Sequence, residues 1–161
     1  MDKLYSPWRQ RYVVKNSKKT PEDVCVFCTK LAEHKDAEHF IIKRFKYVTV
    51  LLNLFPYNAG HLLIIPNKHC KDLGELNPEE RNELMFVVSE SIAVLDKTIK
   101  PDGVNVGINL GKAAGASIIA HLHVHVLPRW EGDTNYLPLL AETKQISVDL
   151  KQIYQQIKAG F

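Results

Sequence analysis

The sequence lacks any apolar run long enough to span a membrane. Its longest apolar segments, residues 48–52 and 62–65, have the length of β-strands, whereas a spanning helix needs about 20 residues. The first residues also lack the basic and then apolar layout of a signal peptide. We therefore expect a cytoplasmic protein without a membrane partner.

Cysteine is scarce and the charge is nearly balanced. Three cysteines are an odd number, which argues against a disulfide framework. A net charge of +3 does not by itself imply a nucleic-acid partner, and we expect none. The basic excess is concentrated in residues 1–21, which we interpret as a solvated N-terminal arm rather than a phosphate-binding one. The 161 residues contain no internal repeat and fit one domain over residues 1–161.

Hydrophobic patterns and turn residues predict an α+β fold. Asn77, Pro78 and Glu80 form the start signal of a helix that continues to Pro101. Further helices are expected at residues 25–32, where a turn is the alternative, and 146–157. Strands are expected at residues 46–54, 61–65, 103–109 and 121–127. Strands, a long helix and then strands again favour a mostly antiparallel sheet.

Three histidines alternate with apolar residues in the last of these strands. Alternate side chains of a strand share a face, so His121, His123 and His125 are expected to point the same way. The Cα atoms of His121 and His125 would lie about 13 Å apart, too far to share one metal ion. One end of the row could bind a metal while the rest contact substrate; a metal held by His121 and His123 is the alternative.

The pair Cys25 and Cys28 has the spacing of half a zinc site. His69 and His121 are candidates for the other half. Two buried reduced thiols and a thioredoxin-type redox pair are alternatives. Cys70 is interpreted as a separate buried thiol.

A loop of small residues at 111–117 directly precedes the histidine strand. Glycine and alanine let backbone N–H groups approach an anion, and Ser117 adds a hydroxyl donor. Glycine loops are often only turns, so the interpretation of this loop as an anion-binding site depends on the histidines beside it.

The pattern His121-x-His123-x-His125 followed by two apolar residues resembles the histidine triad (HIT) family of nucleotide hydrolases and transferases. Residues 53–65 resemble its ribose-binding strand and following histidine. Residues 4–9 and 105–133 are most similar to the diadenosine tetraphosphate phosphorylase and hydrolase branch. The resemblance implies a five-stranded antiparallel sheet with one long and one or two shorter helices. It also implies a homodimer whose sheets join.

The resemblance assigns a role to each residue of the site. His123 would attack the α-phosphorus of a dinucleoside polyphosphate and form a covalent nucleotidyl-histidine, a reaction that suits neutral imidazole. His125 would contact the phosphate and help protonate the leaving group, and His61 would support the same region. The purine nucleotide would be held without an organic cofactor by Asn53 at the ribose, by Phe27 at the base, and by Asn109, Gly115, Ala116 and Ser117 at the phosphate.

Zinc-containing members of the family imply a structural metal site. Cys25, Cys28, His69 and His121 match their ligand set, which would be four-coordinate and closed. The phosphorylase members lack this set. The chain therefore combines a phosphorylase-like core with the zinc pattern of other branches.

Several functions remain open at this point. Water as acceptor would make a hydrolase, and orthophosphate would make a phosphorylase. An adenosine phosphoramidase would use the same intermediate. A nucleotide-binding or scaffolding protein with little turnover, and a metalloenzyme with an open metal, are further alternatives. DNA-adenylate repair is less favoured, because no nucleic-acid module accompanies the domain.

Overall fold

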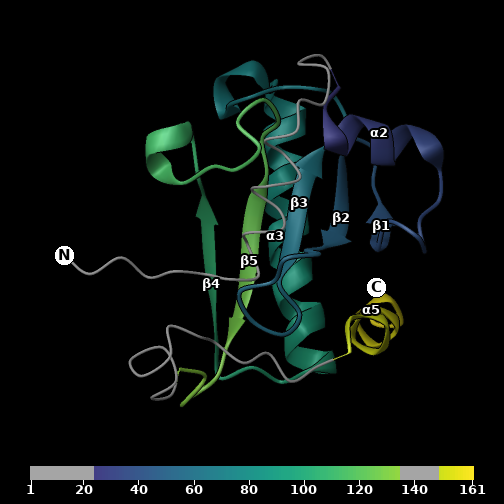
Figure 1. Ribbon diagram of the computed structural model, residues 1–161, viewed down its shortest axis with the longest axis vertical. Coiled ribbons are helices and arrows are strands. Elements are labelled where there is room, and N and C mark those ends of the chain that lie inside the picture. Colours follow the sequence, from purple (N-terminus) through teal and green to yellow (C-terminus); the bar gives the residue numbers. More distant parts are fainter. Residues whose placement is uncertain (1–23, 135–148) are drawn as a thin grey trace.

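The computed structural model describes residues 24–134 and 149–161. The predicted N-terminal arm and residues 146–148 of the predicted C-terminal helix lie outside these ranges. Five antiparallel strands form one sheet in the order β1-β2-β3-β5-β4 (Figure 1). Three α-helices accompany them in the described ranges, which confirms the predicted α+β class. The elements are α2 (Val26–Glu33), β1 (Ile41–Arg44), β2 (Val48–Leu52), β3 (Leu62–Pro66), η1 (Leu73–Glu75), α3 (Pro78–Thr98), β4 (Gly103–Ile108), η2 (Lys112–Ala114), β5 (Val124–Arg129) and α5 (Leu150–Lys158).

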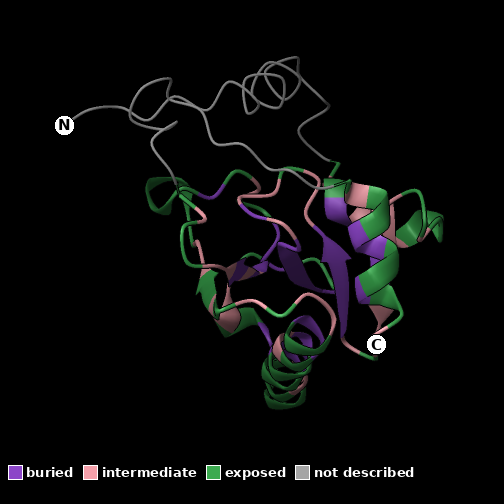
Figure 2. Ribbon diagram, turned by 90° about the horizontal axis from the view of Figure 1, so that it is seen from below, coloured by how far each residue is buried: buried purple, intermediate pink, exposed green. Residues whose placement is uncertain are grey.

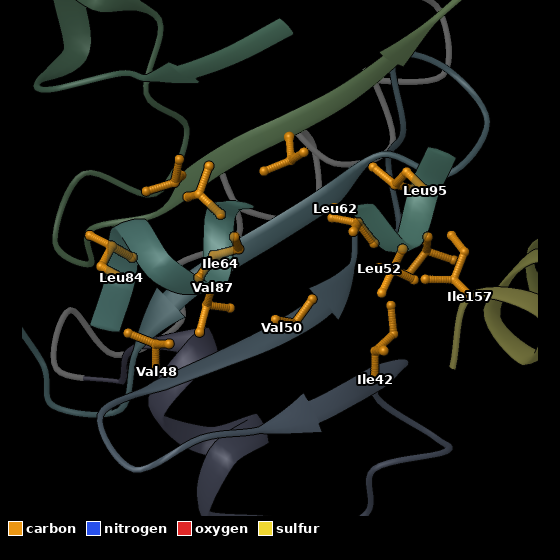
Figure 3. Packing of buried hydrophobic residues seen from close by; sticks show 14 of the residues in the cluster. Ile42, Val48, Val50, Leu52, Leu62, Ile64, Leu84, Val87, Leu95 and Ile157 are labelled. Carbon is orange, nitrogen blue, oxygen red and sulfur yellow. The ribbon is translucent and has the colours of Figure 1, made fainter. Parts of the chain in front are cut away.

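Alternation along the central strands sends apolar side chains to both faces of the sheet. β2 and β3 are buried along their whole length. Val50, Leu52 and Ile64 belong to the main core (Figure 3). Leu51 and Leu63, one position away, belong to a second cluster on the opposite face. The sheet therefore has two apolar faces, and each must be covered.

Helix α3 covers the face that carries the main core. The Asn77 side chain accepts from the Glu80 N–H and the Glu80 carboxylate accepts from the Asn77 N–H, which confirms the predicted capping box. The helix packs against β2, β3 and β5 and lies behind the sheet in Figure 1. Its buried residues follow one side, as Figure 2 shows. α5 contacts both α3 and β1, and the Tyr154 hydroxyl donates to the Ile41 carbonyl at 3.0 Å.

Helix α2 packs on the opposite face of the sheet. Phe27, 3% exposed, contacts a cluster that includes Ile41, Leu51, Leu63 and Ile65. This face also carries His125, because Val124 and Val126 on either side of it point into the main core. Thus α2 and the histidines share one face. Within the described residues, no helix is long and apolar enough to cross a membrane.

The predicted strands at 46–54, 61–65 and 103–109 are confirmed as β2, β3 and β4. The strand predicted at 121–127 is partly wrong, since β5 begins at Val124 and continues through Pro128 to Arg129. β3 pairs with it only from Ile64 opposite Val124 onward. The preceding segment is held by other contacts, among them a hydrogen bond of 2.7 Å from the Leu122 N–H to the Cys70 carbonyl. β1 was not predicted from residue patterns.

Candidate active site and metal centre

Two histidines from neighbouring strands meet on the α2 face. His125 lies on β5, opposite Leu63 of β3, and His61 directly precedes β3. Their rings are in contact: His61 Nε2 lies 2.9 Å from His125 Nδ1. His61 is fully buried. The pairing of β3 with β5 therefore brings the two rings together.

Main-chain geometry decides where the protons of this pair reside. The Tyr57 N–H donates to His61 Nδ1 at 3.2 Å, and the Asn53 amide nitrogen lies 3.3 Å from the same atom. His61 Nδ1 is thus an acceptor, so the neutral ring carries its hydrogen on Nε2. That hydrogen is donated to His125 Nδ1. His125 in turn carries its own hydrogen on Nε2.

Burial keeps His61 neutral. Desolvation, together with the nearby His125 and His123 rings, lowers the pKa of His61 to about 3. Unfolding restores an ordinary pKa near 6.5. Between about pH 6.5 and pH 3, His61 therefore binds a proton in the unfolded chain but not in the folded chain. The free energy of unfolding must fall as the pH is lowered through this window.

We expect His61 to contribute a loss of about 2 kcal/mol in the free energy of unfolding between pH 7 and pH 5. Urea denaturation at a series of pH values measures it. The His61→Gln variant, which has no titrating group at this position, should show a correspondingly shallower pH dependence. Parallel curves for the two proteins would contradict the pKa assignment.

His123 has the opposite proton arrangement. Its Nδ1 donates to the His121 carbonyl at 2.8 Å, so Nε2 of the neutral ring holds a lone pair. Burial lowers the pKa of His123, which keeps that lone pair available near neutral pH. The His123 and His125 ring centroids lie 5.0 Å apart. A ring with an unprotonated Nε2, that of His123, thus lies next to a ring with a protonated Nε2, that of His125.

The four predicted metal ligands come together in space. The sulfur atoms of Cys25 and Cys28 and one ring nitrogen each of His69 and His121 lie within 4.8 Å of one another. The two cysteines face the same way because Cys25 is the N-cap of α2 and Cys28 lies three residues later. His69 follows β3, and His121 precedes β5. Cys70 is buried and is not part of this set.

The donor distances fit a tetrahedral metal. His121 Nδ1 lies 3.2 Å from Cys25 Sγ and 3.6 Å from Cys28 Sγ, and His69 Nδ1 lies 3.3 Å from Cys28 Sγ. Bonds of about 2.0–2.3 Å to a central zinc would separate such atoms by roughly 3.3–3.8 Å. His121 Nε2 donates to the Pro66 carbonyl at 2.9 Å, which leaves Nδ1 unprotonated for a metal. These residues can therefore hold a metal ion.

The thiols must lose protons when a metal binds. Burial and the adjacent Cys25 thiol raise the pKa of Cys28 to about 11, so the empty site favours the protonated thiol. Burial also lowers the pKa of His121 and keeps its ring neutral. Metal binding at this site is thus coupled to proton release.

The predicted phosphate loop lies between β4 and β5. Gly111 and Gly115 adopt φ values of 80° and 87°, which enclose the short helix η2, and Asn109 Nδ2 would lie 3.9 Å from a Cβ at position 115. Two loop amides already donate within the loop: Gly115 N–H to the Lys112 carbonyl at 3.0 Å, and Ala116 N–H to the Gly111 carbonyl at 3.3 Å. The N–H groups of Gly115 and Ala116, which were predicted to bind phosphate, therefore already have partners within the loop.

Phe27 and Asn53 flank the histidines. The Phe27 ring centroid lies 5.4 Å from that of His121 and 5.6 Å from that of His123, between the metal ligands and the proposed nucleophile. Asn53 follows β2, and its N–H donates to the His61 carbonyl at 2.8 Å. The structure thus gathers every predicted site residue except the loop members around β3 and β5.

Sequence reasoning missed one residue that contacts the histidines. Tyr57 supplies the N–H that orders the His61 ring, and its own ring lies 4.8 Å from that ring; its position in the turn before His61 could have drawn attention to it.

Comparison with known proteins agrees with this geometry. A model of the HIT domain matches residues 34–132. The chain belongs to the HIT family. It is 37% identical over 150 residues to AP-4-A phosphorylase of Mycobacterium tuberculosis, a match that covers 91% of this chain and 77% of that protein.

Two further HIT relatives bear on the site. The asymmetrical bis(5'-nucleosyl)-tetraphosphatase of Schizosaccharomyces pombe is 33% identical over 93 residues, 58% of this chain and 50% of that protein. A Zn-bound histidine triad family protein from Mycobacterium smegmatis, with 28% identity and a TM-score of 0.69, covers 84% of this chain and 91% of its own. The HIT fold predicted from the histidine pattern is thereby confirmed.

Proposed function

We propose that this HIT protein is an enzyme that cleaves a dinucleoside polyphosphate, such as diadenosine tetraphosphate, at its α-phosphorus through a covalent intermediate on His123. The observation that carries the proposal is the ordered proton arrangement. His123 offers an unprotonated Nε2, and His125 beside it carries a hydrogen on Nε2. The names of the two relatives, a phosphorylase and a tetraphosphatase, support this substrate class.

In the first step, the lone pair of His123 Nε2 forms a bond to the α-phosphorus. The bond from phosphorus to the bridging oxygen breaks, and the leaving nucleotide takes its electron pair. The His125 Nε2–H donates a hydrogen bond to that oxygen, which leaves as a phosphate anion, and the hydrogen bond from His61 Nε2 to His125 Nδ1 holds the His125 ring in this orientation. The His121 carbonyl, which accepts from His123 Nδ1, stabilises the positive charge that develops on the modified ring.

In the second step, an acceptor attacks the nucleotidyl-histidine and the phosphorus–nitrogen bond breaks. With orthophosphate as acceptor, diadenosine tetraphosphate yields ADP and ATP. With water, it yields AMP and ATP. We propose orthophosphate as the acceptor, because the relative that matches over 91% of the chain is a phosphorylase. Asn53 and Phe27 would orient the ribose and the purine.

We propose zinc as the metal of the tetrad, supported by the two-sulfur, two-nitrogen donor set. Cys25, Cys28, His69 and His121 would hold it in a closed site, where zinc supplies rigidity rather than an activated water. An open metal on His121 and His123 is disfavoured, since His123 Nδ1 donates to a carbonyl and His121 Nδ1 faces the cysteines.

Product analysis tests the function directly. The protein is incubated with diadenosine tetraphosphate, with and without orthophosphate, and the adenine nucleotides are separated. ADP with ATP only in the presence of orthophosphate would support the phosphorylase. AMP with ATP in its absence would identify a hydrolase and overturn the choice of acceptor. Turnover of adenosine phosphoramidate alone would assign a phosphoramidase, and no turnover with tight AMP binding would assign a nucleotide-binding protein.

We further propose a cytoplasmic homodimer in which the β4 edges of two copies pair. Within the described sheet, β4 is an edge strand that pairs with β5 alone. Val106 on this strand is 45% exposed, and an open apolar edge invites pairing with another strand.

We expect Val106→Lys to convert the dimer to monomer, because it places like charges near each other at the paired edges. Light scattering after size exclusion reads the mass. Val26→Lys is a matched control, since Val26 is 44% exposed but lies on α2. A wild-type monomer, or a Val106→Lys protein that remains dimeric, would contradict this assembly.

A further inference from the structure

His121 belongs to the metal centre and to the active site through different atoms. Its Nδ1 lies among the metal ligands and its Nε2 donates to the Pro66 carbonyl. Its own carbonyl accepts the hydrogen bond from His123 Nδ1 at 2.8 Å. The group that fixes the tautomer of His123 is therefore carried by a metal ligand.

The segment that carries both residues is not part of the sheet ladder. β5 begins at Val124, so residues 121–123 precede the first strand pair. Leu122 holds the middle of this segment, because its side chain is buried in the main core and its N–H donates to the Cys70 carbonyl. The contacts of His121 with the cysteines and with Pro66 hold its first residue. A metal at the tetrad would turn these side-chain contacts into a fixed position for the His121 carbonyl.

A second connection runs through α2. Cys25 and Cys28 hold the first turn of the helix at the metal centre, and Phe27 lies between them in sequence. The Phe27 ring is 3% exposed and contacts the rings of both His121 and His123. The N-cap of α2 makes no side-chain capping bond, and the sulfur atoms of Cys25 and Cys28 contact the ring nitrogens of His121 and His69.

We propose that metal occupancy of the tetrad positions His123 for attack, so that the metal controls the rate of the covalent step as well as the stability of the fold. The proposal rests on the proposed role of His123 as nucleophile. His121 is here a positioning residue, and the metal takes no part in bond making. Displacements of about 1 Å in a reacting group can cost 10²-fold in rate. Turnover would then respond to the zinc supply.

His69 allows a clean test, because it is the ligand that belongs neither to α2 nor to the His121–His123 segment. His69→Ala removes one of four ligands and should lose zinc, whereas His69→Cys provides a three-sulfur, one-nitrogen set that also binds zinc. Both variants retain Phe27, His121 and His123. Zinc content, circular dichroism and the rate of nucleotidyl-enzyme formation are measured for each.

We expect folded, zinc-free His69→Ala to form the intermediate about 10- to 100-fold more slowly than wild type, and zinc-loaded His69→Cys to recover most of this loss. A folded, zinc-free His69→Ala with the wild-type rate would overturn the proposal. If His69→Ala does not fold, wild-type protein treated with a chelator and reloaded with graded zinc replaces it. The rate must then follow zinc content.

A spectroscopic measurement separates this proposal from the proposed function. Long-range proton–nitrogen NMR distinguishes an imidazole protonated at Nδ1 from one protonated at Nε2. Zinc-loaded wild type should show His123 as a single Nδ1–H form, and zinc-free protein a mixture. If the protein cleaves no substrate at all, this change still supports the positioning role. An unchanged His123 signal on zinc removal contradicts it even in an active enzyme.

Discussion

Replacement of His123 by alanine is expected to lower kcat for diadenosine tetraphosphate by about 10⁴- to 10⁶-fold. The variant lacks the nitrogen that would bond to phosphorus, and no nearby group can replace it: His125 Nδ1 accepts from His61, and its other nitrogen is protonated in the neutral ring. Nucleotide affinity should change far less, because the residues proposed to contact the ribose, the base and the phosphate are unchanged. Steady-state kinetics and AMP titration measure the two effects.

The control for this experiment is His39→Ala. His39 lies near the start of β1, and its Nε2 is 2.6 Å from the Glu33 carboxylate, outside the site. Its removal should leave kcat unchanged. Substantial activity in a folded His123→Ala protein would refute the nucleophile assignment. Capture of radiolabelled nucleotide by wild type, and its loss in His123→Ala, would identify the covalent step itself.

The second large effect is expected for Cys25→Ser, which removes one thiolate of the metal centre. If zinc is present at about a thousand times its dissociation constant, its binding stabilises the fold by about 4 kcal/mol, and loss of the site should lower Tm by roughly 10 °C. A metal assay should find about one zinc per wild-type chain and almost none in the variant. Thermal unfolding reads the difference.

Cys70→Ala provides the matched control, because Cys70 is a buried thiol outside the tetrad. After treatment with a chelator, added zinc should raise the Tm of wild type and of Cys70→Ala by equal amounts. It should not raise the Tm of Cys25→Ser. A Tm that rises with zinc in all three proteins would show that the stabilising metal binds elsewhere.

Local signals predicted much of the fold. The start of α3 was predicted correctly because Asn77, Pro78 and Glu80 satisfy the first N–H groups of the helix by short-range contacts. β2 and β3 were predicted from continuous apolar runs. β1 was missed because its four residues carry no pattern of their own and gain their strand conformation from pairing with β2.

The site was predictable to the extent that it depends on spacing. Cys25 and Cys28 signal a metal site because only two residues separate them, which places both sulfur atoms within one helical turn, and the resemblance supplied His69 and His121. The departure of His121 from β5 was not predictable, because alternation of apolar residues continues across position 121 while the tertiary contacts with the cysteines and Pro66 do not allow strand pairing. The tautomers of His61 and His123 were not predictable either, because they depend on main-chain hydrogen bonds that form only in the folded chain.

The bond from the Tyr57 N–H to His61 has a consequence for how this site tolerates mutation. The donor that starts the chain of ordered protons belongs to the backbone, so it is present whichever side chain occupies position 57, with proline as the sole exception. A substitution at this position can replace the ring that packs on His61 without changing which nitrogen of His61 carries the hydrogen. Most single substitutions at position 57 should therefore leave the tautomers of His61 and His125 unchanged.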